Sequence, residues 1–167
     1  LPAEQLVADI RKGQAARVSG TAVFMLRNPS GTPPALLHHL KHNHVLHQLV
    51  VLMSVVTLEV PHVADEDRLS VVKIADDFYR VVASYGFAES PDVPSILKGC
   101  ENKGLVFEMM KTTFFLSRET FITHPKGGIV NLWQRLFSLM ARNSLQATVY
   151  FGIPPNRVVE LGRQVQL

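Results

Sequence analysis

The chain of 167 residues holds a single cysteine, Cys100. One thiol cannot form a disulfide framework within the chain, and so sparse a use of cysteine is typical of a reducing compartment. No pattern of a histidine together with an acidic residue, which could activate a thiol, surrounds Cys100. We therefore expect Cys100 to be a small structural residue near a helix end and not a nucleophile.

Long hydrophobic runs are missing as well. The longest largely apolar run, residues 49–56, is far shorter than the roughly 20 residues that a membrane-spanning helix needs. We expect no signal peptide in residues 1–10, because Glu4, Gln5 and Asp9 interrupt the apolar residues there. With 47% hydrophobic and 19% charged residues, the chain is predicted to fold as one domain with a well-filled core. Because it begins with leucine, we expect it to be part of a larger protein.

Signatures of several function classes are absent. The sequence has no nucleophile elbow, no Walker or Gly-x-Gly-x-x-Gly loop, and no paired carboxylates at a metal-binding spacing. We therefore expect neither enzyme activity nor a cofactor. The basic residues are spread thinly and are not interleaved with aromatic residues, which argues against nucleic-acid binding.

Acidic residues are missing from a long N-terminal stretch. No Asp or Glu lies between Arg11 and Leu58. The basic residues and histidines of that stretch are Arg11, Lys12, Arg17, Arg27, Lys41, His38, His39, His42, His44 and His47. This charge pattern suits an anionic ligand or a cytoplasmic membrane surface, and a mixed surface that binds nothing is the alternative. His38 and His42 have a zinc-binding spacing, but we expect no metal site because no Cys, Asp or Glu lies nearby in the sequence.

Residues 20–56 predict a strand, a helix and a second strand. Residues 21–26 are too apolar for a surface strand, and residues 47–56 contain a β-branched run typical of a buried central strand. Between them, the turn-forming residues 28–31 precede Thr32, which we expect to cap a helix beginning at Pro33. Such a βαβ unit would place its two strands side by side and parallel.

The rest of the chain predicts a mixed sheet. Residues 68–75 and 78–87 are strand-like and are separated only by Asp76 and Asp77, which indicates an antiparallel β-hairpin. Further helices are predicted at 2–12, 90–102 and 131–151, and further strands at 112–116 and 157–161. The fold class is therefore α/β, with a mixed, mostly parallel sheet of five or six strands flanked by helices. Residues 1–19 are predicted to be a linker with a short helix, and residues 20–167 the folded domain.

The loop between the first strand and helix is a candidate ligand site. Backbone N–H groups and the helix dipole at a helix N-terminus favour anions. The candidate residues are Arg27, Asn28, Ser30, Gly31 and Thr32, with Arg118, Asn156 and Arg157 as possible further partners of a phosphate. The alternatives are a structural ion pair for Arg118 and a loop-fixing role for Asn156 and Arg157.

Several motifs follow one another in a specific order. They are Arg-Val-Ser-Gly-Thr-Ala-Val-Phe-Met from Arg17, Pro-Pro-Ala-Leu-Leu-His-His-Leu-Lys-His from Pro33, Pro-Asp-Val-Pro from Pro91, Phe-Phe-Leu-Ser-Arg-Glu-Thr from Phe114 and Ile-Pro-Pro-Asn-Arg-Val-Val-Glu-Leu-Gly from Ile153. Together they resemble the cytoplasmic C-terminal region of the Kup (KUP/HAK/KT) potassium uptake transporters over residues 17–167. His39 and His44 depart from the family pattern, which argues further against a metal site.

The resemblance implies a soluble domain at the cytoplasmic face of the inner membrane, attached to a proton-coupled potassium symporter. Potassium and protons would be handled by the membrane part of that transporter, outside this chain. Two functions follow as expectations. The first is a regulatory and assembly domain that forms a homodimer or docks on the membrane part. The second is a sensor domain that binds a nucleotide or cyclic dinucleotide.

Overall fold

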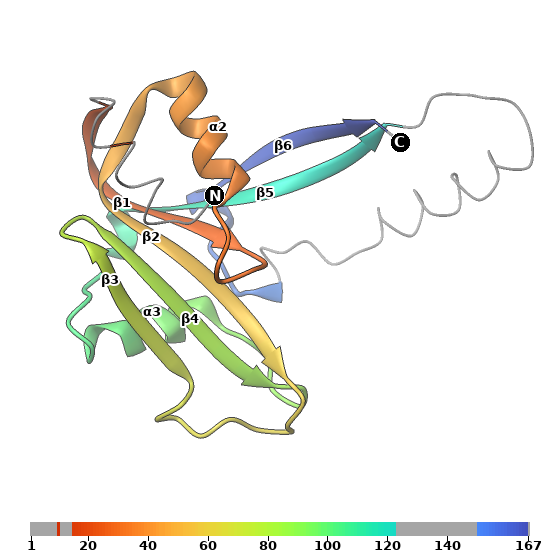
Figure 1. The fold of residues 1–167 in the computed structure, drawn as a ribbon. Helices are drawn as coiled ribbons and strands as arrows, with labels where there is room; N and C mark the ends of the chain where they lie inside the picture. Colours follow the sequence, from red (N-terminus) through yellow and green to blue (C-terminus); the bar gives the residue numbers. More distant parts are fainter. Residues whose placement is uncertain (1–9, 11–14, 123–149, 167) are drawn as a thin grey trace, which may run out of the picture.

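The computed structural model describes residues 10, 15–122 and 150–166. Six strands form one twisted sheet in the order β3-β4-β2-β1-β5-β6, and Figure 1 shows a helix on either side of it. The strands are β1 (Ala16–Leu26), β2 (Val45–Leu58), β3 (Leu69–Ala75), β4 (Phe78–Gly86), β5 (Thr112–Ile122) and β6 (Val158–Gln166). The helices are α2 (Pro34–Asn43) and α3 (Val93–Glu101), with the short 3-10 helices η1 (Met109–Lys111) and η2 (Pro155–Arg157).

The sheet is mixed and mostly parallel, which confirms the predicted fold class. Strands β1 and β2 are parallel neighbours joined through α2, so the predicted βαβ unit is present. Strand β4 lies parallel to β2 on its other side, and β3 forms the antiparallel hairpin with β4. Strands β5 and β6 continue the parallel pairing beyond β1.

Several strands are longer than predicted. Strand β1 begins at Ala16, inside the stretch predicted to be a linker, because Ala16 pairs with Val45 of β2. A bulge between Val18 and Thr21 lies at Gly20, whose φ of 101° favours glycine and whose added Cβ would lie 2.6 Å from the carbonyl oxygen of Lys111. Strands β5 and β6 extend past the predicted ends 116 and 161, because they pair with each other as far as residues 122 and 166.

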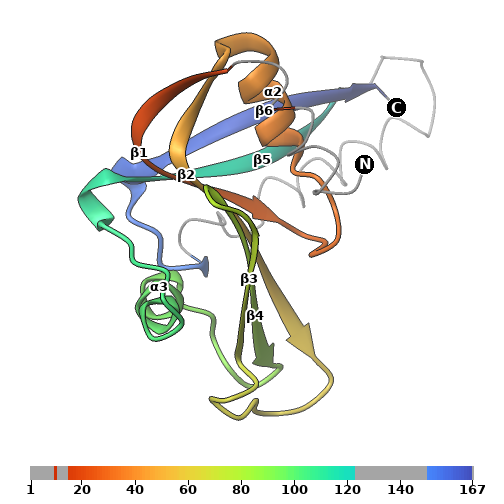
Figure 2. The same ribbon diagram turned by 60° about the vertical axis from the view of Figure 1, so that its left-hand side comes forward.

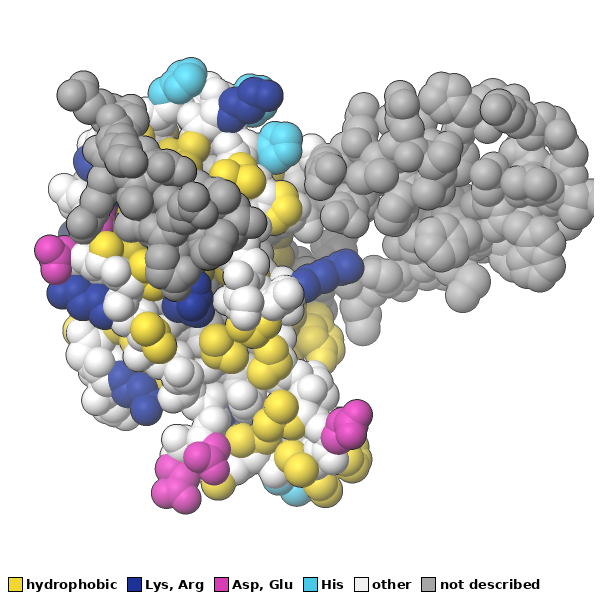
Figure 3. Space-filling model, viewed as in Figure 1, with side chains coloured by type: hydrophobic (Ala, Val, Ile, Leu, Met, Phe, Trp, Pro, Cys, Tyr) yellow, Lys and Arg dark blue, Asp and Glu magenta, His cyan; other side chains and the backbone are white. Residues whose placement is uncertain are grey.

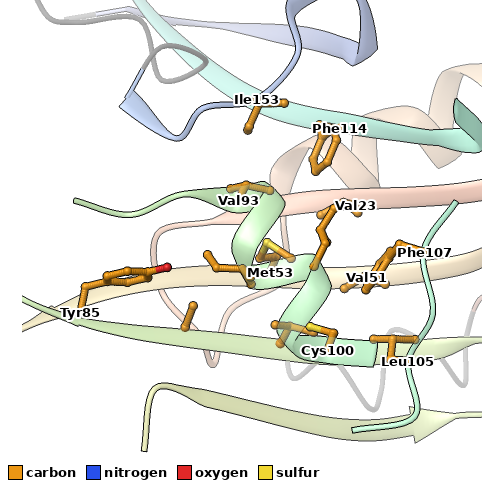
Figure 4. Packing of buried hydrophobic residues seen from close by; sticks show 14 residues of the cluster. Val23, Val51, Met53, Tyr85, Val93, Cys100, Leu105, Phe107, Phe114 and Ile153 are labelled. Atoms are coloured by element: carbon orange, nitrogen blue, oxygen red, sulfur yellow. The ribbon is translucent and has the colours of Figure 1, made fainter. Parts of the chain in front are cut away.

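The core lies on both faces of the sheet. Alternating residues of β1 divide between the faces, because successive side chains of a strand point in opposite directions. Val23 packs in the cluster beneath α3, whereas Ala22 and Phe24 pack in the cluster beneath α2. Figure 4 shows the α3 side, where side chains of the helix meet those of β1 and β2. Figure 2 shows the two helices on opposite faces of the sheet.

The predicted cap of the first helix is wrong. The N-cap of α2 is Pro33, which makes no side-chain hydrogen bond, and the helix begins at Pro34. Pro33 has φ −66° and ψ 124°, an extended conformation, because a residue that precedes proline is sterically excluded from the helical region. Thr32 therefore lies one residue too early to cap the helix.

The second predicted helix, expected at 90–102, is present as α3 over Val93–Glu101. The side chain of Asp92 accepts a hydrogen bond from Ser95 N–H at 2.9 Å, which caps α3. Cys100 is fully buried near the end of the helix, as expected, and burial raises the pKa of its thiol to about 11. The helices predicted at 2–12 and 131–151 lie outside the described residues, apart from Ile10 and residues 150–151.

Candidate functional site

The loop between β1 and α2 forms a tight turn around Asn28. The side-chain oxygen Oδ1 of Asn28 accepts a hydrogen bond from Ser30 N–H at 3.0 Å, and its carbonyl oxygen accepts one from Gly31 N–H at 3.1 Å. Arg27 and Ser30 are exposed beside this turn. Two backbone donors of the predicted site are thus used within the loop itself.

The N-terminus of α2 also offers few donors to an anion. Pro33 and Pro34 have no backbone N–H. The N–H groups of Leu36 and Leu37 both donate to the carbonyl oxygen of Pro33, at 3.0 and 3.3 Å. The predicted anion site therefore has a weaker set of donors than helix N-termini usually present.

Arg118 lies within β5 and not after it. Its backbone pairs with Gly162 of the neighbouring edge strand β6. The prediction that this strand ends at 116, before Arg118, is therefore wrong, because β5 continues to Ile122. The strand carries Arg118 toward the same end of the sheet as Arg27, since β1 and β5 are parallel.

Asn156 and Arg157 lie at the other end of the sheet from the loop. The register of the parallel strands places the start of β6 level with Val23 of β1. Arg27 lies four residues beyond Val23 and Arg157 one residue before Val158, so at about 3.3 Å per residue they are about 16 Å apart along the strand direction. Nη2 of Arg157 instead donates to Met110 Sδ at 3.4 Å. The structure does not bring Asn156 and Arg157 to a phosphate bound at the loop.

The histidines of α2 divide between two environments. His38 and His42 lie on the exposed side of the helix, where their rings stack with centroids 5.8 Å apart. His39 points to the core, is 6% exposed and contacts Phe115 with ring centroids 4.8 Å apart. Its ring centroid lies 6.2 Å from that of His47 on β2. Among the described residues, no group of three or more histidine, cysteine or acidic side chains could hold a metal.

His39 and His47 lie near each other, with His39 buried and His47 half-buried. Burial lowers the pKa of both imidazoles, and the pKa of His39 is lowered further by repulsion from His47. The Asn43 amide lies 2.9 Å from Nδ1 of His39. Within the described part of the chain, Nε2 of His39 and Nδ1 of His47 have no hydrogen-bond partner. Protonation of either ring would therefore place a charge in the core without compensation.

Glu89 is a residue whose role the sequence reasoning missed. Its carboxylate accepts hydrogen bonds from Gly86 N–H at 2.7 Å, from Val63 N–H at 3.2 Å and from Arg68 Nη2 at 2.8 Å. The Arg68 hydrogen bond, followed by that of Gly86 N–H, lowers the pKa of Glu89 to about 2. Arg68 also donates to the carbonyl oxygen of Val63 and to Asp65. Glu89 thus joins the end of β4 to the loop that follows β2.

Backbone contacts close the same corner of the sheet. Phe87 N–H donates to the carbonyl oxygen of Val60 at 2.9 Å, and Ala88 N–H donates to that of Pro61 at 3.2 Å. At Gly86 an added Cβ would lie 2.2 Å from the Pro61 carbonyl oxygen, so only glycine allows this approach. We call residues 58–68 and 86–89 the β2–β4 corner. The sequence signal for this corner is a glycine at the end of a strand followed by an aromatic residue, Gly86 and Phe87.

The surface of the β2–β4 corner combines apolar and acidic side chains. Leu58, Val60 and Phe87 are 41%, 43% and 66% exposed. The exposed carboxylates are those of Glu59, Asp65, Glu66 and Asp67. Figure 3 shows apolar side chains between two groups of acidic ones at the bottom of the molecule, over the loop between β2 and β3. Such a surface suits contact with another macromolecule better than catalysis.

The sequence model of the K+ potassium transporter C-terminal domain matches residues 19–167. The chain belongs to this family, as the C-terminal domain of a Kup-type transporter. It is 50% identical to the probable potassium transport system protein Kup of Myxococcus xanthus over 167 residues, which are 100% of this chain and 26% of the relative. The Kup of Anaeromyxobacter dehalogenans strain 2CP-C is 46% identical over 172 residues, again 100% of this chain and 26% of the relative.

The chain spans about a quarter of the length of the curated relatives it matches. Kup 1 of Geobacter sulfurreducens is 48% identical over 152 residues, 90% of this chain and 24% of that relative. No solved structure matches the chain with significance. In the described residues, no helix has the length and hydrophobicity needed to cross a bilayer.

Proposed function

We propose that this chain is a cytoplasmic regulatory and assembly domain of a proton-coupled potassium uptake transporter. The observation that carries the proposal is the match of the whole chain to about a quarter of proteins named as potassium transport systems. Transport of potassium and protons would belong to the membrane part of the transporter, as in other secondary transporters whose ion sites lie between membrane helices.

The edges of the sheet support an assembly role. Strands β3 and β6 end the sheet, and in the described part of the chain each pairs with a single neighbour. An edge strand presents backbone N–H and C=O groups to a second copy or to another part of the same transporter. Val72 on β3 is 49% exposed and Val159 on β6 is 40% exposed, so both edges also carry apolar surface. The exposed side of the helix predicted at 131–151 lies outside the described residues.

Regulation requires that the domain contacts two transport states differently. Such a contact has one interaction free energy in each transport state. It can shift the equilibrium between the two states only by the difference between these two free energies. A domain with its own two-sided core can change position as a unit while its contacts change. This favours a rigid docking domain over a segment that only tethers.

A sensor of nucleotides or cyclic dinucleotides is the alternative function, and it has less support. Arg27 is exposed beside the β1–α2 loop and could contact a phosphate. However, Asn28 accepts the N–H groups of Ser30 and Gly31, and Arg157 lies at the other end of the sheet. Calorimetry of the chain against a panel of nucleotides and cyclic dinucleotides tests this alternative. Heat released on binding, and its loss in Arg27→Ala, would favour the sensor.

Light scattering on the purified chain tests the assembly role. A mass of twice 18.6 kDa supports a homodimer. A strictly monomeric chain contradicts the homodimer, and unchanged potassium uptake by a transporter from which the domain has been deleted contradicts the regulatory role.

A further inference from the structure

We infer that the β2–β4 corner is a docking surface for a basic, amphipathic segment on the cytoplasmic side of the transporter's own membrane part. The inference rests on the proposed function, which attaches this chain to such a membrane part. Beyond that function, the inference names the surface of the domain that makes the contact and the chemical character of its partner.

The apolar side chains of the corner come from two adjacent strand ends. Leu58 of β2 is the register partner of Gly86 in β4, and Phe87 follows directly. The hydrogen bond from Phe87 N–H to the Val60 carbonyl oxygen brings the two segments together beyond the strands. A phenylalanine that is 66% exposed at such a position leaves a large apolar surface in water, which a partner would cover.

The corner is rigid before any partner binds. The Glu89 carboxylate receives three hydrogen bonds, from Arg68, Gly86 and Val63, and thereby ties both segments together. The guanidinium carbon of Arg68 also lies 5.0 Å from the centre of the Tyr85 ring. Because these contacts fix the backbone on which Phe87 sits, docking would order little of the domain. Preformed surfaces of this kind bind more tightly than flexible ones of equal area.

The charge of the corner selects a basic partner. Glu59, Glu66 and Asp67 are exposed, and the guanidinium of Arg68, which belongs to the corner, is paired with Glu89 and Asp65. The carboxylates would repel anionic lipid headgroups, and they would repel the same corner of a second copy. Cytoplasmic loops of membrane proteins carry an excess of lysine and arginine, so the membrane part offers the complementary charge.

Photo-crosslinking in the full-length transporter tests the inference. The variant is Phe87→p-benzoylphenylalanine, and the matched control is Met110→p-benzoylphenylalanine, because Met110 is 75% exposed on η1, beside the start of β5. We expect position 87 to form crosslinks that mass spectrometry maps to lysine- and arginine-containing loops of the membrane part. Position 110 is expected to give no such crosslinks.

Charge reversal supplies the second arm of the test. The double variant Glu66→Lys with Asp67→Lys should lower the crosslinking yield at position 87 by roughly threefold or more, because attraction is replaced by repulsion. Glu101→Lys, exposed at the end of α3, is the control that should leave the yield unchanged. All these positions are exposed, so the purified chains should keep the melting temperature of the wild type.

The inference is overturned if position 87 forms crosslinks only with a second copy, only with lipid, or no more with the membrane part than position 110 does. The proposed function fails separately, if deletion of the domain leaves potassium uptake unchanged. If deletion of the domain alters uptake but position 87 does not crosslink to the membrane part, the docking surface is rejected and the proposed function is kept.

Discussion

At the scale of single residues, Glu89 joins two separate segments of the chain. Its carboxylate bonds to two backbone N–H groups and to Arg68, and each of these hydrogen bonds favours the ionised form. These contacts lower the pKa of Glu89 from 4.5 to about 2. An acid whose pKa falls on folding stabilises the fold above its unfolded pKa, and this stabilisation is lost as the pH decreases toward the folded pKa.

We therefore predict that Glu89→Gln lowers the melting temperature by a few degrees at neutral pH. The difference from the wild type should shrink as the pH falls below 4.5 and vanish near pH 2, because a protonated Glu89 resembles glutamine. Thermal unfolding followed by circular dichroism measures this, with the exposed Glu66→Gln as control. A difference that stays constant over the whole pH range would show that the charge of Glu89 is not involved.

The buried histidine pair gives a second pH dependence. The pKa values of His39 and His47 are lowered by folding, so the unfolded chain binds protons more readily as the pH falls below 6.5. The free energy of unfolding should therefore decrease as the pH falls below 6.5. In His39→Leu the loss of stability with falling pH should be less steep than in the wild type. His38→Leu, on the exposed side of the same helix, should keep the wild-type slope. Equal slopes in all three proteins would contradict this assignment.

Cys100 should be inert in the folded chain. Its thiol is fully buried and its pKa is raised to about 11, so the thiolate is scarce near neutral pH. We expect Ellman's reagent to react with the native chain roughly a hundredfold or more slowly than with the chain in denaturant. Similar rates in the two conditions would place Cys100 at the surface.

The sequence predicted α3 and the place of Cys100 near its end, because helix start signals and helical periodicity are local in the sequence. The predicted cap Thr32 is wrong because Pro34 keeps Pro33 out of the helical conformation, so the helix begins one residue later than predicted. Glu89 was missed because its partners Arg68 and Val63 are distant in sequence.

At the scale of elements, the close approach at Gly86 decides how β4 ends. An added Cβ would lie 2.2 Å from the carbonyl oxygen of Pro61, a backbone atom that cannot rotate away. We predict that Gly86→Ala destabilises the chain by about 1–3 kcal/mol, as overpacking does. Urea unfolding measures this change. The control is Gly162→Ala on β6, where an added Cβ meets no heavy atom of the described residues within 4 Å and the change should stay within about 0.5 kcal/mol. Equal effects of the two substitutions would contradict the packing argument.

Element types were predictable, whereas strand lengths were not. The hairpin of β3 and β4 followed from two alternating runs around a short polar turn. The true start of β1 lies before the bulge at Gly20, where a glycine interrupts the apolar pattern. Strands β5 and β6 support each other as far as residues 122 and 166, through a pairing that neither segment's own pattern reveals.

At the scale of the whole molecule, the sequence indicated a mixed α/β sheet but not its strand order. Strand β5 returns beside β1, on the opposite side from β2 and β4, because α3 crosses the other face of the sheet before it. Periodicity reports which face of a strand is buried and not which neighbour it has. The β2–β4 corner could not be predicted for the same reason, since it joins segments from two separate strand ends.

The arrangement gives the domain two kinds of surface for a transporter to use. The edges β3 and β6 offer backbone pairing, and the β2–β4 corner offers an apolar surface rimmed by carboxylates. Both surfaces belong to a sheet whose two faces are covered by α2 and α3. Under the proposed function, these surfaces would make the contacts through which the domain biases a transport cycle.

Potassium uptake tests this account most directly. Cells that lack other potassium uptake systems would carry either the full-length transporter or the same protein without residues 19–167, at equal amounts in the membrane. The account predicts that uptake persists without the domain, and that its rate or its dependence on external potassium changes roughly threefold or more. Identical uptake curves for the two proteins would contradict it.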